Sequence, residues 1–431
     1  MKKGGNRLEA VISKNTRYEN SIFIIVFFST FMLVQFGIFD FFLCLQIVFF
    51  LVHIVITRRL RITRDRTIIS LYCIWILSTL LCLVSDIPLS YKKNSIIAIV
   101  FLVPTFFTIS FYERYIKSER FVAYIKKALT LTCVLQVLLC FVQFFLYRVA
   151  HIDLNQLVFS DIFHMVENPS QYKLGVFHPS GMCWHSAFMA PVVIIAFIVC
   201  DSYLIKILAI IDAVICNNAT AMIGICVCLG LTGMFSIIDL LKRESKIVRK
   251  RTFIVASLIV VAIIPILFCT DIVPVVCDKI VDIYGRATGA VYDGGSANAH
   301  IRYFTAYPNV VKNGSIIQFL FGYGTGNSGY TMSKLYGQYA ELKSWVVETD
   351  VMDQIYSNGI IGFVLYYKFL LYIAIKGYKL NRKYFILIAS IIFAGITYNI
   401  KFDWVLFVEF LLYLTIKFKV DLFEASRYEG E

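Results

Sequence analysis

The sequence predicts an all-α, polytopic integral membrane protein, and three observations carry that prediction. Hydrophobic residues make up 59% of the 431 residues, and charged residues only 16%. A soluble protein of this size could not bury so much apolar surface and keep a solvated exterior. Apolar runs recur along the chain at lengths near the roughly 20 residues that a helix needs to cross a bilayer. Short basic stretches separate many of these runs, as in loops that orient a membrane protein.

We expect about twelve transmembrane helices, which form a single polytopic domain over residues 1–431. No small-residue cleavage pattern follows the first apolar run, so we expect a retained anchor rather than a signal peptide. The run before Cys216 is short, but leaving it out would move the basic stretch 242–251 to the other side of the membrane. The predicted spans lie near 21–38, 40–57, 68–86, 95–112, 129–148, 183–202, 204–217, 219–240, 252–269, 358–376, 384–400 and 403–418.

The net charge of +13 lies mainly in short loops. The basic clusters within 58–66, 114–127, 242–251 and 376–383 fall on one side of the predicted topology, together with the N-terminal arm. The positive-inside bias makes that side cytoplasmic, so we expect both termini in the cytoplasm. Nucleic acid is not an expected partner, because it would need a continuous basic face on a polar domain.

Two larger loops, 149–182 and 270–357, face outward in this topology, whereas the other outer connections are short. Binding and catalytic residues are often carried by loops that a rigid scaffold positions. We therefore expect recognition or chemistry on the outer face, although a long loop can also be tolerated without any role.

The end of the first loop places ionisable groups at the mouth of the predicted sixth span. Pro179 keeps His178 out of the α region, and Ser180 can cap the helix that follows. His178 is therefore a candidate catalytic residue for proton transfer, and Lys173 is a candidate ligand for a phosphate. The alternative is an ordinary capped helix entry with a solvated lysine and histidine.

The second loop contains Arg302, which begins a helical pattern up to Pro308. A guanidinium near a bilayer surface can bind phosphate through two parallel hydrogen bonds. Arg286 and Lys312 are further candidates for a phosphate contact. Tyr303 and Tyr323 belong to a series of loop tyrosines whose rings suit sugar faces, and equally suit a membrane-interface belt. Arg302 as an ordinary surface or headgroup contact also stays open.

The segment 321–327 is a turn with glycine at every second position, whose amides could hold phosphate. It follows no βαβ unit, so it is neither a P-loop nor a dinucleotide fingerprint. Glu348, Asp350 and Asp353 then lead into the tenth span. An acid held just outside the membrane could accept a proton from an attacking sugar hydroxyl, but acids at a helix N-terminus are also favoured by the helix dipole.

No metal site and no cofactor are predicted. The 12 cysteines form no CxxC pair, and most lie in apolar runs, as small packing residues do. The histidine spacings match no compact ligand motif. Charged residues in or beside the predicted spans are costly and usually have a partner or a role; a transporter hypothesis starts from them. They are Asp212, Lys368, Asp403 and Glu409.

Four landmarks in this order resemble the O-antigen polymerase and O-antigen ligase superfamily of bacterial membrane proteins. The resemblance covers about 170–365 by motif and the remainder by hydropathy only. The landmarks are Gly-Val-Phe-His-Pro-Ser at 175–180, Ser296 followed by Arg302, Phe-Gly-Tyr-Gly-Thr-Gly-Asn at 321–327, and the acidic segment before Gly359 and Gly362.

The resemblance implies a GT-C-like architecture and a metal-independent glycosyltransferase in the bacterial cytoplasmic membrane. The substrate would be an undecaprenyl-diphosphate-linked glycan, transferred with inversion at the outer face. Other expected partners are membrane lipids, a chain-length regulator and a flippase of the same pathway. The implied function is polymerisation of lipid-linked repeat units into surface polysaccharide. The alternatives are a ligase of the same superfamily or, from another class, a lipid-linked-sugar flippase or secondary transporter.

Within that resemblance, Arg302 matches the arginine that holds the diphosphate. Glu348 stands where ligases carry a histidine proposed as the base, which favours a polymerase. His178 stands where polymerases often have glutamate, and Lys173 replaces a frequent arginine, which keeps the charge but loses the bidentate geometry. The base is therefore expected to be Glu348 or His178.

Overall fold

The computed structural model describes residues 18–37, 39–166, 172–173, 176–243, 303–335, 347–399, 401 and 403–428. The chain divides into two compact units, and each is described on its own. The first unit combines Met1–Cys228 with Gly314–Glu431, and the second is Leu229–Asn313. The predicted span near 252–269 lies outside the described residues, and so do the candidates Arg286 and Arg302.

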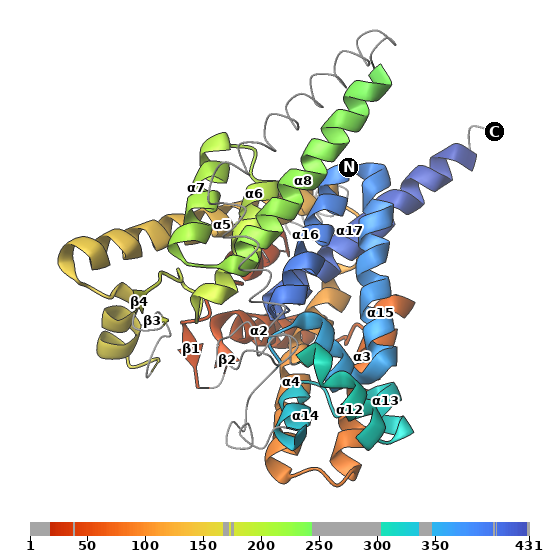
Figure 1. Ribbon diagram of the computed structural model, residues 1–431. Coiled ribbons are helices and arrows are strands. Elements are labelled where there is room, and N and C mark those ends of the chain that lie inside the picture. The colour runs from red at the N-terminus through yellow and green to blue at the C-terminus, as the bar shows by residue number, and fades with distance from the viewer. Residues whose placement is uncertain are drawn as a thin grey trace, which may run out of the picture. The chain divides into compact units, whose positions relative to one another are not determined.

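Figure 1 shows a predominantly helical chain, with two short antiparallel hairpins in the first unit. The hairpins are β1–β2 (Gln35–Phe36 and Phe39–Asp40) and β3–β4 (Tyr172–Lys173 and Val176–Phe177). The helices of the first unit are Tyr18–Phe27, α2 (Phe41–Thr57), α3 (Arg66–Val84), α4 (Leu89–Tyr112), α5 (Glu119–Ala150), α6 (Met189–Val199), α7 (Tyr203–Ile215), α13 (Ile316–Phe321), α14 (Ser328–Leu335), α15 (Asp350–Leu380), α16 (Arg382–Thr397) and α17 (Asp403–Tyr428). Two further helices are α8 (Ala219–Arg243), which crosses the boundary between the units, and α12 (Tyr307–Asn313) in the second unit.

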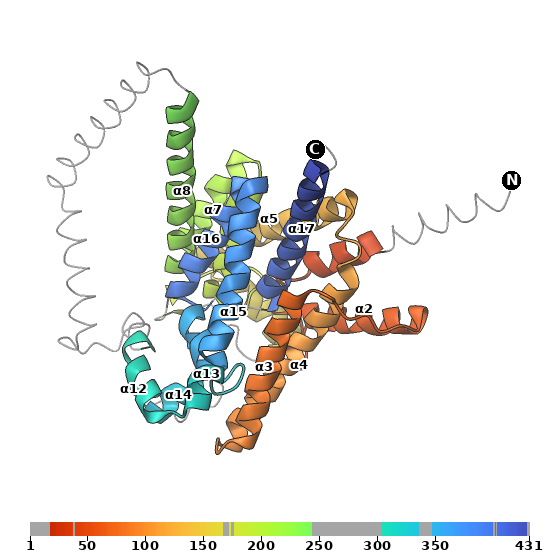
Figure 2. The same ribbon diagram turned by 90° about the vertical axis from the view of Figure 1, so that its right-hand side faces the viewer.

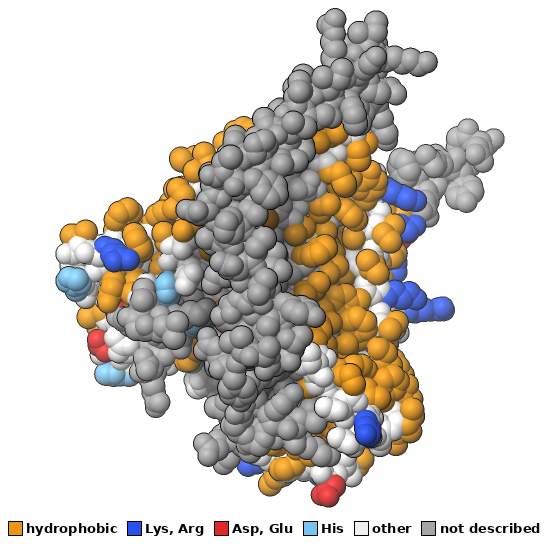
Figure 3. Space-filling model, viewed as in Figure 1, with side chains coloured by type: hydrophobic (Ala, Val, Ile, Leu, Met, Phe, Trp, Pro, Cys, Tyr) orange, Lys and Arg blue, Asp and Glu red, His pale blue; other side chains and the backbone are white. Residues whose placement is uncertain are grey.

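Five of the described helices are long and apolar enough to cross a membrane, so the chain is an all-α, multi-pass membrane protein. These five are α3, α4, α5, α8 over Ala219–Asp239, and α15. In Figure 3, hydrophobic side chains dominate the described surface on this face, and Lys and Arg side chains gather along one edge. Large apolar side chains that are exposed in this way need lipid around them.

Helix α15 is the centre of the first unit, because it packs against α3, α13, α16 and α17. Figure 2 shows it beside α16 and above α13. Its buried Phe369 contacts two rings of α17, with ring centroids 5.3 Å from Phe410 and 5.2 Å from Tyr413. Aromatic rings at such separations add stabilisation beyond the apolar area that they bury.

The prediction of one continuous first span over 21–38 is wrong. The helix ends at Phe27, and the chain continues through turns into the β1–β2 hairpin. Polar side chains of α5 satisfy backbone carbonyls in this break: Thr132 donates to the Phe27 carbonyl at 2.8 Å, and Gln136 donates to the Thr30 carbonyl at 3.3 Å. Irregular backbone at membrane depth is stable where protein groups replace the missing helical hydrogen bonds.

Ion pairs within the first unit join connections that the predicted topology places on one side. Asp201, between α6 and α7, lies 3.1 Å from Lys383 and 3.6 Å from Lys126. Lys383 begins α16, and Lys126 lies in the first turns of α5. The predicted topology puts all three residues at the cytoplasmic end, so these contacts agree with the predicted order of the spans.

Candidate functional site

The segment that leads into α15 is held in place by hydrogen bonds on both sides of Glu348. The Val347 amide donates to the Ser328 hydroxyl at 3.0 Å, and the Val347 carbonyl accepts from Asn399 at 3.3 Å. Thr349 caps α15 by accepting from the Met352 amide. Val347, Thr349 and Asp350 are buried, whereas Glu348 is only half-buried. The fold therefore fixes the backbone on both sides of Glu348, while the residue itself is partly exposed.

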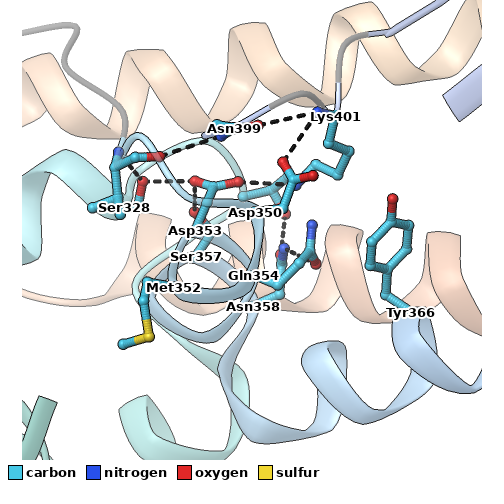
Figure 4. A network of polar contacts seen from close by, with 12 residues as sticks. Ser328, Asp350, Met352, Asp353, Gln354, Ser357, Asn358, Tyr366, Asn399 and Lys401 are labelled. Carbon is cyan, nitrogen blue, oxygen red and sulfur yellow. Dashed lines mark hydrogen bonds and ion pairs between the residues drawn. The ribbon is translucent and has the colours of Figure 1, made fainter. Parts of the chain in front are cut away.

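A buried cluster of polar groups surrounds the first turns of α15, which follow Glu348 in the sequence (Figure 4). One oxygen of Asp353 accepts from Ser328 at 2.6 Å and from Ser357 at 3.3 Å, while the other lies 2.9 Å from Lys401 Nζ. The Lys401 amide also donates to Asp350 Oδ1 at 3.0 Å. Each Asp353 oxygen thus has a donor, so this carboxylate is suited to holding structure rather than to accepting a substrate proton.

The glycine-rich turn after α13 docks against a break in α15. Gly359 has φ 66° and ψ −174°, which interrupts the helical backbone. Two carbonyls freed just before the break accept from the turn: the Tyr323 amide donates to Tyr356 at 2.9 Å and the Gly324 amide to Ser357 at 3.0 Å. Because these two amides are engaged, they cannot hold a phosphate. Gly322 instead permits close contact with the α15 backbone, because an added Cβ would lie 2.4 Å from the Ser357 carbonyl oxygen.

Helix α3 completes the docking of the turn. The Ser78 hydroxyl lies 2.7 Å from the Phe321 carbonyl and 2.7 Å from the Ser357 carbonyl. The Thr325 hydroxyl lies 2.9 Å from the Trp75 carbonyl and 2.7 Å from an amide oxygen of α15, so the turn, α3 and α15 form one rigid assembly.

Tyr323 and Tyr303, predicted as sugar ligands, are both buried. Tyr323 is 5% exposed, and its ring lies 5.9 Å from that of Tyr330. Burial raises the pKa of Tyr323, and the neighbouring Tyr330 raises it further. Tyr303 belongs to the second unit and is fully buried. The helical pattern predicted to end at Pro308 does not end there, because Pro308 lies in the first turn of α12.

The end of the first predicted loop is a tight hairpin anchored to α5. Lys173 pairs with Val176 in the β3–β4 register, and His178 follows β4 in a half-buried position. Beyond it, the amides of Ser180 and Gly181 donate to Gln143 Oε1 at 3.1 and 2.9 Å.

The prediction that Ser180 caps the next helix is wrong. Ser180 is buried against α5, where its hydroxyl accepts from Asn155 at 3.4 Å. The cap is His185, whose Nδ1 accepts from the Ala187 amide at the start of the short 3₁₀ helix η2 (Ser186–Phe188) that leads into α6. Buried glutamines of α5 hold the chain non-helical past residue 180, so the helix begins later than predicted.

Two of the charged residues predicted within spans are buried, and one is exposed. Glu409 of α17 is 2% exposed and accepts from the Tyr366 hydroxyl at 3.0 Å. The centre of the Tyr366 ring is 5.9 Å from Lys401 Nζ, which links this pair to the polar cluster at the start of α15. Asp212 is fully buried, whereas Lys368 is exposed.

A polar cavity lies among basic residues near the predicted cytoplasmic end, away from the cluster at the start of α15 in the sequence. Its cationic groups suit an anionic headgroup at the membrane surface. It is far in sequence from the landmarks 175–180 and 321–327. The lining residues are Tyr18, Glu19, His53, Thr57, Arg61, Arg114, Tyr115, Lys117, Ser118 and Phe121.

Sequence reasoning selected Glu348, Asp350 and Asp353 but missed Lys401 and Ser328, which hold them. Lys401 stands between two predicted spans, where a lysine usually signals only a loop. Its one sequence signal is its place at the same predicted end of the membrane as the acidic segment. Ser328 carries no signal in the sequence, since its role depends on how α14 packs against α15.

No protein-family model matches the chain, and no curated protein matches it.

Proposed function

We propose that this protein polymerises undecaprenyl-diphosphate-linked oligosaccharide repeat units at the outer face of the bacterial cytoplasmic membrane. The proposal includes about twelve transmembrane helices, a GT-C-like architecture and cytoplasmic termini. Its main support is the placement of Glu348, a half-buried acidic residue on a segment that hydrogen bonds hold at Val347 and Thr349. A second support is that two landmarks of the resemblance, the glycine-rich turn and the acidic segment, belong to one assembly around the break in α15.

In this mechanism a hydroxyl of the incoming repeat unit attacks the anomeric carbon of the growing chain. A new carbon–oxygen bond forms while the bond to the lipid diphosphate breaks, and Glu348 accepts the hydroxyl proton. Arg302, helped by Lys173, stabilises the negative charge that develops on the departing diphosphate. His178 is the other candidate base. Arg286, Tyr303 and Tyr323 remain predicted substrate ligands.

The test is complementation of a gene deletion, with surface glycan separated on a gel. We expect Arg302→Ala and Glu348→Gln to remove the ladder of long chains and leave single capped repeats, while the protein still inserts into the membrane. Lys93→Ala is the matched control, because Lys93 is an exposed cation of α4 at the predicted outer side, and it should keep the ladder. A normal ladder from Arg302→Ala would show that the diphosphate role is wrong.

A transporter of lipid-linked sugars is a second candidate, favoured by the buried carboxylates Glu409 and Asp212. The activity of a transporter should survive Arg302→Ala and Glu348→Gln but be lost in Glu409→Gln. Deletion of its gene should leave unpolymerised precursor in the cytoplasm. If the protein were a ligase of the same superfamily, deletion of the gene would not stop polymerisation. The cell would still make polymer, but the polymer would stay unattached.

A further inference from the structure

Three metal-binding side chains meet between α5 and the end of α7, in a part of the molecule that the proposed function does not use. Asp212 and Cys216 are four residues apart, so they share one face of α7 at its C-terminus. Cys140 reaches them from α5, and one ligand atom from each residue lies within 4.8 Å of the other two. All three residues are fully buried.

The Asp212 carboxylate lacks a partner for its charge. One of its oxygens, Oδ1, lies 3.7 Å from the Cys216 thiol, but Oδ2 is buried without a hydrogen-bond partner. No ion pair of the described residues includes Asp212. A buried carboxylate in this situation must either carry a proton or be next to a cation. A metal ion at this position would supply the positive charge.

The distances and ligand types fit zinc. In a tetrahedral site with Zn–S bonds of about 2.3 Å and Zn–O bonds of about 2.0 Å, a sulfur and an oxygen ligand lie about 3.5 Å apart. The observed separation between Cys216 Sγ and Asp212 Oδ1 is 3.7 Å. Two thiolates with one carboxylate favour Zn²⁺, whereas Cu⁺ prefers sulfur ligands alone. The fourth position can take a water molecule.

We propose that Cys140, Asp212 and Cys216 form a structural Zn²⁺ site that ties the end of α7 to α5. Binding displaces the thiol protons of Cys140 and Cys216 and the proton that Asp212 carries without the metal. All three protons pass to solvent, and the three ligands are left charged around the metal. The site fixes the turn at Asn217, where the chain has φ 48° before Asn218 caps α8 through the Ala221 amide at 3.0 Å. This proposal is independent of the glycan polymerase function and requires no metal in the glycosyl transfer.

The experiment measures zinc in the full-length protein, purified in detergent through a tag without histidines and equilibrated with Zn²⁺. Wild-type protein should retain a stoichiometric amount of zinc after desalting, whereas Cys216→Ser and Asp212→Asn should lose it. Cys133→Ser is the matched control. It removes an equally buried thiol two turns earlier on the same helix, outside the cluster, and should keep the metal.

A second readout covers variants that fold poorly. Since a ligand that binds only the folded state raises its stability, Zn²⁺ should raise the melting temperature of wild-type and Cys133→Ser protein, and a chelator should lower it. The proposal is overturned if wild-type protein holds no zinc and Zn²⁺ does not change its melting temperature. A Cys140–Cys216 disulfide in freshly purified protein, or binding of Cu⁺ without Zn²⁺, would also overturn it.

Discussion

Lys401 has its ammonium 2.9 Å from Asp353 Oδ2, and the side chains of this pair are only 17% and 5% exposed. Lys401→Met would leave Asp353 as a buried charge without its cation. Breaking a buried ion pair on one side typically costs about 3–5 kcal/mol. We therefore expect a large fall in the melting temperature of the detergent-purified protein, and substantial recovery in the double variant Lys401→Met, Asp353→Asn.

The matched control for that change is Lys383→Met, which removes an exposed partner of Asp201. These side chains are 51% and 73% exposed. Such surface pairs contribute about 0–1 kcal/mol, so the melting temperature should change little. Equal losses from the two lysine variants would contradict the assignment of Lys401 as a buried structural cation.

The ion pairs of Asp201 predict how the stability of the fold changes at acidic pH. The neighbouring Lys383, and then Lys126, lower the pKa of this carboxyl below its ordinary value of 3.8. A lowered folded-state pKa means that the carboxylate stabilises the fold above pH 3.8, and that this contribution is lost as the pH falls through the folded-state value. Wild-type protein should lose more stability than Asp201→Asn between pH 4 and about 2. Added salt should shrink the difference, because both partners are exposed.

At the residue scale, the sequence could identify which residues carry charge but not which charges meet. Glu348, Asp350 and Asp353 stand out because acids lead directly into an apolar run. Lys401 does not, because its pairing with Asp353 depends on how the connection before α17 folds over the start of α15. The Cys140–Asp212–Cys216 cluster was hidden for the same reason, since its ligands lie on two helices and form no compact motif.

At the scale of secondary-structure elements, Gly359 decides whether α15 is continuous or broken. Its φ of 66° and ψ of −174° belong to a region that is essentially restricted to glycine, and an added Cβ would lie 2.3 Å from the Leu320 carbonyl oxygen. Gly359→Ala should cost at least about 1–3 kcal/mol in stability. It should also loosen the contact between α13 and α15, which a thermal melt and protease sensitivity of the 321–327 turn would report.

Gly230→Ala in α8 is the control for that substitution. Apart from the backbone of its own helix, no atom of the described residues lies within 4 Å of an added Cβ at this glycine, and its backbone is helical. Alanine is favoured over glycine in a helix by up to about 1 kcal/mol, so this variant should be neutral or slightly more stable. A destabilised Gly230→Ala would mean that any glycine change in these helices is harmful.

The spans that are uniformly apolar were predicted well, and the irregular ones were not. The predicted spans 68–86 and 95–112 correspond to α3 (Arg66–Val84) and α4 (Leu89–Tyr112). The predictions of the first span and of the entry to α6 are wrong because Gln136 and Gln143 of α5 form hydrogen bonds with non-helical backbone in these segments. Hydropathy registers how apolar a segment is, but it does not register hydrogen bonds supplied by another helix.

At the scale of the whole molecule, the predicted topology places the connection at Asp201 in the cytoplasm and that at Lys401 outside. Alkaline phosphatase needs disulfides that form outside the cytoplasm, so it can report the side of each connection. A fusion after Asp201 should be inactive, and a fusion after Lys401 should be active. Activity from both fusions, or from neither, would contradict the predicted number of spans between them.

The docking of the glycine-rich turn against α15 also has a consequence for hydrogen–deuterium exchange. The amides of Tyr323 and Gly324 lie in a connection, where rapid exchange is usual, yet both donate to carbonyls of α15. They can exchange only when the turn leaves the break at Gly359, so their rates measure that opening. We expect them to exchange as slowly as the core amides of α15, and to accelerate together in Gly359→Ala.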